Sequence, residues 1–171
     1  MPALILLILA ILIWLLAQRA RRATGLPAGV VMYTDMHAQG WSRVEKPLFS
    51  SALQLTGKPD YLVRGSQGLI PVEVKSGPAP AGGPREGHIY QLAAYCALVA
   101  EAYDQRPAYG LIQYADQTLA VDYTPALEAE LLDLLAEIRA DAEANEVDRS
   151  HESAARCRAC GFREVCDQAL D

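Results

Sequence analysis

The sequence predicts an α/β or α+β domain, a mixed β-sheet flanked by helices, preceded by one transmembrane helix. Three observations predict this class. Short apolar segments are bounded by glycine- and proline-containing turns, as strands are, and two longer segments have helical spacing. The chain has 171 residues, which suits one compact domain. Apolar residues make up 51% of the chain, and their excess over an ordinary globular value lies in an unbroken run at the start. The net charge of −6 excludes a protein that coats nucleic acid by bulk positive charge.

The apolar run Ala3–Ala17 predicts a membrane anchor within residues 1–22. With the two residues before it, the run reaches the lower limit of about 17 residues for a spanning helix. Arg19, Arg21 and Arg22 follow it, and the positive-inside rule places them and the chain beyond in the cytoplasm. We therefore expect a single-pass membrane protein whose domain faces the cytoplasm. A cleaved signal or a buried core helix is the alternative.

Residues 23–42 are expected to be a linker with the first short elements, and residues 43–145 the core domain. The predicted strands are Val30–Tyr33, Arg43–Phe49, Tyr61–Arg64, Leu69–Val74, Tyr109–Tyr114 and Thr118–Tyr123. Pro47 cannot donate to a central ladder, so its strand is predicted at a sheet edge. Turn residues at 65–68 and 115–117 predict that the last four strands form two hairpins.

Two helices are predicted in the same domain. A loop rich in glycine and proline, residues 76–87, leads into a helix over His88–Tyr103. Thr124 caps a second helix, which begins at Pro125 and ends near Glu143. The apolar stripe expected to face the core is Leu127, Leu131, Leu134, Leu135 and Ile138. Residues 146–171 then carry a group of cysteines.

Three charged residues are expected to meet at one end of the first hairpin. Asp60 begins one strand, while Glu73 and Lys75 end its neighbour and, being two apart, point to the same face. Neighbouring carboxylates repel unless a cation lies between them, and hard oxygen ligands suit Mg²⁺ or Mn²⁺. A lysine beside such a metal can orient an attacking water and stabilise developing charge. A surface ion pair on the hairpin is the alternative.

The pattern of Asp60, Glu73 and Lys75 resembles that of the PD-(D/E)xK nuclease superfamily. Gln91-x-x-x-Tyr95 is similar to the added motif of its RecB-like exonuclease branch. The resemblance, which covers about residues 43–166, implies a restriction-endonuclease-like fold and hydrolysis of phosphodiester bonds. It also implies DNA as the partner, as single strands or duplex ends.

The resemblance assigns roles to the residues that match. Asp60 and Glu73 would be metal ligands for Mg²⁺ or Mn²⁺, with the Val74 carbonyl as a further one, and Lys75 would be the catalytic lysine.

On the following helix, Gln91 and Tyr95 would be catalytic residues that contact the phosphate backbone or the active-site lysine. They lie four apart, hence on one helix face. The alternative is a helix with Tyr95 in the core. His88, one turn earlier, either faces the same site or has no role there.

The sequence departs from the CRISPR-associated exonucleases of this branch at its start. Those proteins have an N-terminal helical region with a cysteine and a metal-binding histidine, where this chain has the predicted anchor. His37 is the histidine that precedes Asp60, and it is either a metal ligand or an ordinary loop residue.

Three cysteines lie close together near the C-terminus: Cys157, Cys160 and Cys166. They resemble the iron–sulfur-binding end of the same exonucleases, which implies a [4Fe–4S] cluster. Such a cluster usually has four thiolate ligands, and Cys96 is either the fourth or a core residue. Zinc bound with His151 or another group, and three free thiols, are alternatives. Four arginines near these cysteines could contact DNA phosphates: Arg149, Arg156, Arg158 and Arg163.

Together these features predict a metal-dependent nuclease, an exonuclease on DNA, anchored to the cytoplasmic face of the membrane. One alternative is a catalytically inactive, membrane-tethered adaptor that binds DNA or protein and keeps a structural iron–sulfur or zinc site. Another is a redox or sensing element built on the cysteines.

Overall fold

A computed structural model describes residues 31–33, 41–65 and 68–171 of the chain. The predicted anchor in residues 1–22, the start of the linker and His37 lie outside the described residues. Within the described ranges, none of the helices has the length and apolar character needed to cross a membrane. The chain forms two compact units, Met1–Leu132 and Asp133–Asp171.

Six strands of the described residues form one mixed sheet in the first unit, in the order β1-β8-β7-β6-β5-β2. They are β1 (Val31–Tyr33), β2 (Trp41–Arg43), β5 (Tyr61–Gly65), β6 (Gly68–Val74), β7 (Tyr109–Gln113) and β8 (Thr118–Asp122). β6 and β7 pair in parallel, and the other neighbours pair antiparallel. The predicted class, a mixed sheet flanked by helices, is confirmed and is consistent with the restriction-endonuclease-like fold.

The single edge strand predicted over Arg43–Phe49 is wrong. Arg43 ends β2, and the chain leaves the main sheet after the Val44 N–H donates to the Asp60 carbonyl at 3.2 Å. Pro47 lacks an N–H and cannot continue a ladder. The chain then forms a separate two-stranded sheet of β3 (Leu48–Ser50) and β4 (Leu55–Gly57).

The hairpin of β5 and β6 confirms the predicted strands at Tyr61–Arg64 and Leu69–Val74, each extended by a glycine. Its register runs from Gly65 opposite Gly68 to Tyr61 opposite Val72. Gly68 has φ +109°, and a Cβ there would lie 2.7 Å from the Gln105 side chain. Glycine is therefore favoured at this position by its backbone conformation.

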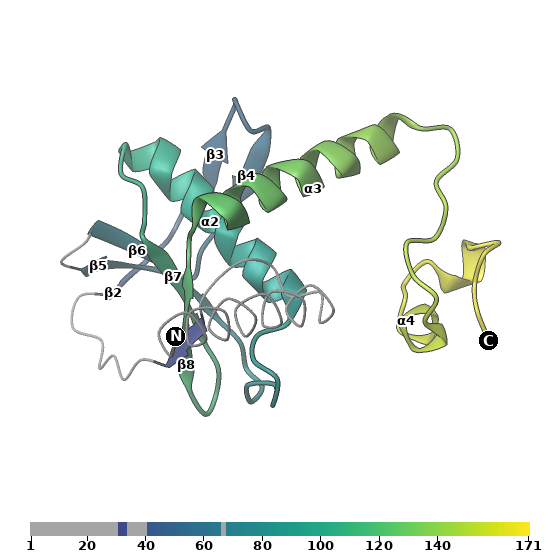
Figure 1. Cartoon of the computed structure of the whole chain (residues 1–171), viewed down its shortest axis with the longest axis horizontal. Coiled ribbons are helices and arrows are strands. Elements are labelled where there is room, and N and C mark those ends of the chain that lie inside the picture. Colours follow the sequence, from purple (N-terminus) through teal and green to yellow (C-terminus); the bar gives the residue numbers. More distant parts are fainter. Residues whose placement is uncertain (1–30, 34–40, 66–67) are drawn as a thin grey trace, which may run out of the picture. The chain divides into compact units, whose positions relative to one another are not determined.

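The helix α2 (Glu86–Tyr103) lies against one face of the sheet, where it contacts β6 and β7, and it also contacts β3 and β4 (Figure 1). It begins two residues before the predicted helix. Gly110 of β7 allows a close approach, because a Cβ there would lie 2.6 Å from Cγ of Leu92 on α2. On this face the core includes Leu62, Leu69 and Val99.

The opposite face of the sheet has its own apolar core, because adjacent strand residues point to opposite sides. Its buried members are Val63, Ile70, Val72, Leu111 and Ala120. The strands β5 and β6 are thus held on both faces, which fixes the end of the hairpin.

The helix α3 (Pro125–Glu143) begins as predicted, with Oγ1 of Thr124 accepting from the Leu127 N–H at 3.1 Å. Its first turns are packed, since Leu127 and Leu131 are buried. The prediction that the stripe stays buried to its end is wrong, because Ile138 is 53% exposed. Helical spacing alone produces an apolar stripe, whereas burial also requires a surface to pack on.

The second unit contains the helix α4 (Ala154–Arg158) and the 3₁₀ turn η1 (Arg163–Val165). Arg149 holds it together: its backbone N–H donates to Oε1 of Gln168 at 2.6 Å, and its guanidinium pairs with Glu152 at 2.9 Å. The Ser153 side chain caps α4. This unit is closed by polar contacts of its own.

Candidate active site

The two predicted acidic residues lie opposite each other at the end of the β5–β6 hairpin. Continuing the register by one pair beyond Tyr61 and Val72 places Asp60 opposite Glu73. Directly opposed residues of antiparallel strands share a face, and this is the face that α2 covers. Asp60 is further fixed because its Oδ2 accepts from the Val74 N–H at 2.8 Å.

Glu73 is the one acidic side chain that is buried among the described residues, with 7% of its surface exposed. Burying a carboxylate costs free energy unless it is paired and hydrogen-bonded. Its Oε1 accepts from Lys75 Nζ at 2.8 Å and from Gln91 Nε2 at 2.9 Å. These two donors compensate the loss of water and keep the carboxylate in place.

Lys75 completes the predicted acid and lysine group. Its backbone N–H donates to the Gln113 carbonyl at 2.8 Å, which extends the parallel pairing of β6 and β7 by one residue. Its ammonium group contacts Glu73 and also donates to Oε1 of Gln91 at 2.9 Å. The structure thus brings the amine to the carboxylate, as the sequence pattern predicts.

Gln91 connects the helix to this group through both ends of its amide. Its Oε1 accepts from Lys75, and its Nε2 donates to Glu73 and to the Tyr95 hydroxyl at 2.9 Å. Desolvation raises the pKa of Tyr95, although its hydrogen bond with Gln91 acts in the other direction. Tyr95 therefore keeps its proton and serves as a neutral partner that holds Gln91. The term "carboxylate–lysine–amide group" is used below for Glu73, Lys75 and Gln91.

The oxygens of this site suit a divalent metal ion. Asp60 is exposed, its Oδ2 accepts from the Val74 N–H, and the continued β5–β6 register places it opposite Glu73. Mg²⁺ is usually bound through one or two carboxylates and keeps several waters. The described residues include no group of three or more His, Cys, Asp or Glu side chains that could hold an ion by themselves. An ion at this site would therefore rest on two carboxylates, a backbone carbonyl, water and substrate.

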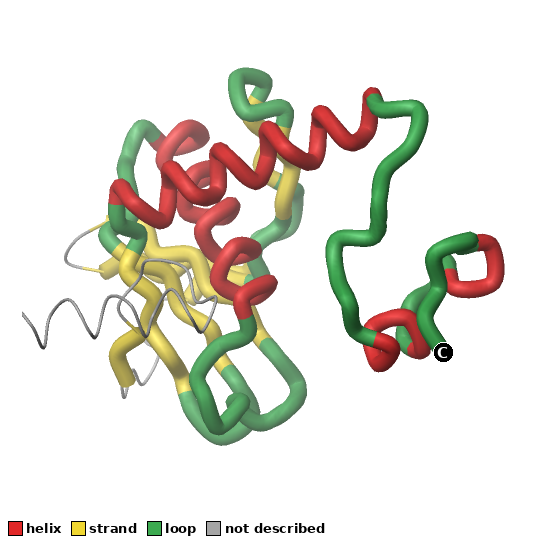
Figure 2. Tube along the Cα trace, turned by 45° about the vertical axis from the view of Figure 1, so that its right-hand side comes forward, coloured by secondary structure: helices red, strands yellow, loops and turns green. Residues whose placement is uncertain are grey.

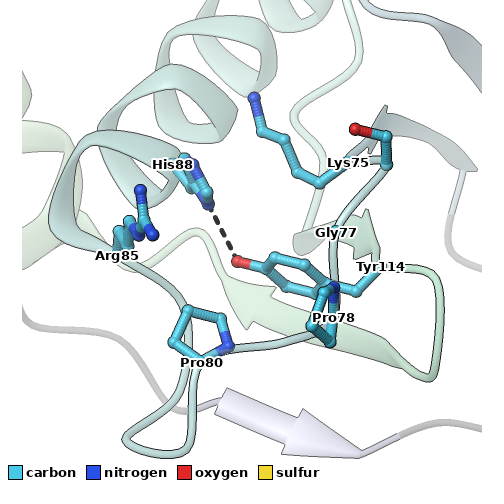
Figure 3. A pocket seen from close by; sticks show the side chains of 8 residues that line it. Lys75, Gly77, Pro78, Pro80, Arg85, His88 and Tyr114 are labelled. Carbon is cyan, nitrogen blue, oxygen red and sulfur yellow. Dashed lines mark hydrogen bonds between the residues drawn. The ribbon is translucent and has the colours of Figure 1, made fainter.

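Beside Lys75 there is a cleft of about 210 Å³ (Figure 3). Its lining residues are Lys75, Ser76, Gly77, Pro78, Pro80, Arg85, His88 and Tyr114. His88 thus lines the cleft beside the candidate active site, and its Nδ1 lies 2.9 Å from the Tyr114 hydroxyl. Desolvation, followed by the positive charges of Lys75 and Arg85, lowers the pKa of His88 below 6.5. Sequence reasoning missed Arg85 and Tyr114, because they lie in a loop and at a strand end and no spacing links them.

Cys96 is a core residue of the first unit, 1% exposed, and burial strongly raises the pKa of its thiol. In the second unit, Cys157 is buried in α4, whereas Cys160 and Cys166 are exposed, and all are free thiols. The described residues do not bring three of these thiols together as metal ligands. The described residues therefore give no support to the predicted iron–sulfur cluster.

Comparisons with known proteins complete the description. A family model described as the PD-(D/E)XK nuclease superfamily matches residues 5–167. Comparison with the curated proteins gives no match. Among solved structures, one titled "Crystal structure of SSO0001" is similar, with a TM-score of 0.46 and 23% sequence identity, over 68% of this chain and 52% of that chain. The chain therefore spans about half the length of that solved protein.

Proposed function

The chain belongs to the PD-(D/E)XK nuclease superfamily, and we propose that it is a Mg²⁺- or Mn²⁺-dependent nuclease that hydrolyses DNA. Members of this superfamily generally cleave phosphodiester bonds with such ions. The observation that carries the proposal is the carboxylate–lysine–amide group, in which one buried Glu73 oxygen lies 2.8 Å from Lys75 and 2.9 Å from Gln91. A surface ion pair would not need such burial or a third partner from another element.

In the proposed mechanism, Asp60, Glu73 and the Val74 carbonyl would hold the metal ion, which would supply neutralisation of the phosphate charge and a bound water of lowered pKa. The chain's own part is to fix the ligands: the backbone of β6 holds Asp60, and Lys75 and Gln91 hold Glu73. Carboxylates that are already oriented need little rearrangement when the substrate arrives.

Lys75 has the role of orienting the attacking water and stabilising negative charge on the phosphate. Its ammonium group has three donors, of which two are used, by Glu73 and Gln91. The side chain is 24% exposed, so one face remains accessible. Gln91 keeps the amine close to the carboxylate, and Tyr95 keeps Gln91 in its rotamer.

The finer assignment is an exonuclease of the RecB-like branch, acting on single strands or duplex ends. What supports it is the pair Gln91 and Tyr95, four residues apart on α2 and joined at 2.9 Å beside Glu73. We also propose that the apolar run Ala3–Ala17, with the arginines after it, anchors the domain to the cytoplasmic face of the membrane.

The proposal is tested with the full-length chain, purified in mild detergent and supplied with Mn²⁺ and end-labelled single- and double-stranded DNA. Glu73→Gln and Lys75→Met are expected to lower the cleavage rate by about 100-fold or more, because each removes a group that acts on the transition state. Arg64→Gln is the matched control, since Arg64 is exposed at the far end of β5.

Equal cleavage rates in all four proteins would refute the catalytic assignment. If the wild-type chain binds DNA without cleaving it, the adaptor becomes the better description. Shortening from one labelled end supports the exonuclease, whereas internal cuts contradict it.

A further inference from the structure

The cleft beside Lys75 is positively charged, although the chain as a whole carries −6. Its lining includes Lys75, Arg85 and His88 and no aspartate or glutamate. Among the described acidic residues, Glu73 is close enough for its charge to raise the pKa of His88, and Glu73 is itself paired with Lys75 at 2.8 Å. An anion in this cleft would therefore meet positive charge and little repulsion.

The walls of the cleft are held before any ligand arrives. The loop after β6 lines the cleft with Ser76, Gly77, Pro78 and Pro80, and Tyr114 follows β7. The loops after β6 and β7 lie side by side at the end of the sheet (Figure 2). The Ala115 N–H donates to the Gly77 carbonyl at 3.0 Å, and the Ala79 N–H donates to Oδ1 of Asp116 at 2.8 Å. Pro78 and Pro80 stiffen the same loop. A site prepared in this way loses little conformational entropy on binding.

Arg85 and His88, at the start of α2, have donors that no acidic residue in the described part of the chain occupies. Within the described residues Arg85 makes no ion pair, and Figure 3 shows it beside His88 at the beginning of the helix. The Tyr114 hydroxyl and Nδ1 of His88 share a hydrogen bond of 2.9 Å, and we assign the hydroxyl as its donor, which corresponds to the imidazole tautomer protonated at Nε2. That assignment leaves the Nε2–H of His88 as a donor for a ligand.

The cleft also adjoins the candidate catalytic group. Lys75 lines the cleft and, at the same time, contacts Glu73 and Gln91. His88 and Gln91 are three residues apart on α2, hence neighbours on one helix face. A chain of phosphates bound at the catalytic group would continue into this cleft.

From this arrangement we infer that the cleft binds the phosphate next to the scissile one in the nucleic-acid substrate, through Arg85 and the His88 imidazole. The inference rests on the proposed nuclease function and adds the residues that position its substrate. Arg85 supplies charge and a planar pair of donors, and His88 supplies one donor whose ring Tyr114 holds in place. Neither takes part in bond breaking.

Binding tests the inference separately from cleavage. The full-length chain and its variants are titrated with a fluorescent single-stranded oligonucleotide, with Ca²⁺ in place of Mn²⁺, at several salt concentrations. We expect Arg85→Gln to weaken binding by about tenfold and to reduce the slope of log affinity against log salt by about one. His88→Gln should weaken binding less, and Arg64→Gln, which removes the same charge from an exposed strand position, should stay within about twofold of wild type.

A second measurement places the contact on one phosphate. A series of oligonucleotides carries a single uncharged methylphosphonate at successive positions, and the Mn²⁺-dependent KM and kcat are measured for each. When the methylphosphonate is next to the cleavage site, the KM of wild type should rise to the KM that Arg85→Gln shows with unmodified DNA. Arg85→Gln should not raise the KM further on that modified oligonucleotide. With the methylphosphonate at any other position, the KM increases caused by the methylphosphonate and by Arg85→Gln should multiply. The kcat should change little, because the contact is remote from the reacting atoms.

The outcomes separate the two ideas. If the wild-type chain cleaves DNA and Arg85→Gln binds the oligonucleotide as tightly as Arg64→Gln, this inference is overturned. The proposed nuclease function is then unaffected. Binding that depends on Arg85, without any cleavage, supports the cleft and refutes the hydrolytic function. Absence of binding by a wild-type chain with normal circular dichroism overturns the inference.

Discussion

At the scale of single residues, the Gln91 side chain hydrogen-bonds three other side chains of the candidate site. One amide contacts the lysine, the buried carboxylate and a tyrosine hydroxyl, and its donor and acceptor ends match each partner. Sequence spacing could place Gln91 and Tyr95 on one helix face. It could not predict that the face would meet Glu73, because that contact joins residues 18 positions apart through the packing of α2 on the sheet.

Replacing Gln91 with leucine should therefore affect both stability and activity. The change removes a donor to a buried carboxylate, which costs about 1–3 kcal/mol in the free energy of unfolding. It also frees Lys75, and we expect the cleavage rate to fall by about 10- to 100-fold. Urea unfolding and single-turnover cleavage measure the two effects. Tyr95→Phe is the control, since it removes only the hydroxyl and should cost less in both. Wild-type stability in Gln91→Leu would contradict the assigned contacts.

His88 gives a prediction about pH. In the folded chain desolvation and the charges of Lys75 and Arg85 hold its pKa below the usual 6.5. As the pH falls through 6.5, the unfolded chain binds a proton that the folded chain does not, so the free energy of unfolding decreases. Above that pH His88 is neutral in both states and the effect vanishes. Between about pH 7.5 and about pH 5, wild type should lose more stability than His88→Gln. A variant that loses as much as wild type would show that His88 titrates normally.

At the scale of elements, turn chemistry and periodicity predicted the strands that form the site. The β5–β6 hairpin follows from Gly65 and Gly68 on either side of a short connection. The structure of Arg43–Phe49 was harder to predict, because its sequence favours a strand throughout. In the structure Pro47 interrupts it, and the residues after Pro47 pair with β4 in a second sheet. The prediction of a buried apolar stripe on α3 was wrong at Ile138, because periodicity does not show whether a packing partner is present. Local patterns indicate what a segment prefers, and partners distant in sequence decide where it packs.

Gly110 should be essential for placing α2. A methyl group there would lie 2.6 Å from Cγ of Leu92, which is 1% exposed and is adjacent to Gln91. Gly110→Ala should lower the free energy of unfolding by about 1–3 kcal/mol through overpacking. It should also lower the cleavage rate, since α2 shifts away from Glu73. Gly82→Ala, at a position with nothing within 4 Å, is the control and should change stability by less than about 1 kcal/mol. Equal stability of the two variants would mean that Leu92 moves without displacing the helix.

At the scale of the whole molecule, the candidate site was predictable in part because its residues lie in one hairpin and one helix. Asp60, Glu73 and Lys75 are brought together by nearest-neighbour strand pairing. The Arg85 and Tyr114 cleft was not predictable, because it depends on two loops that meet only in the folded chain. The three C-terminal cysteines show the opposite case: they are close in sequence, yet the described second unit does not gather them into one site.

The total charge of −6 leads to a prediction about metal ions and DNA. Without a divalent ion, the opposed carboxylates of Asp60 and Glu73 repel a phosphate. Adding Ca²⁺ should therefore tighten the binding of single-stranded DNA by about tenfold or more. Asp60→Asn should lose most of that gain. Fluorescence anisotropy with and without EDTA measures both proteins. Binding that is insensitive to the ion in wild type would place the metal, or the DNA, elsewhere.

The parallel pairing of β6 and β7 has a consequence for how such a domain can diversify. Because these two strands run in the same direction, the loops that follow them emerge at the same edge of the sheet, beside Lys75. The candidate catalytic side chains belong to the strands and α2, while the rim of the cleft belongs to the loops. Under the proposed function, insertions or exchanges in residues 76–85 and 114–117 would alter which polymers are accepted and would leave the candidate catalytic side chains in place.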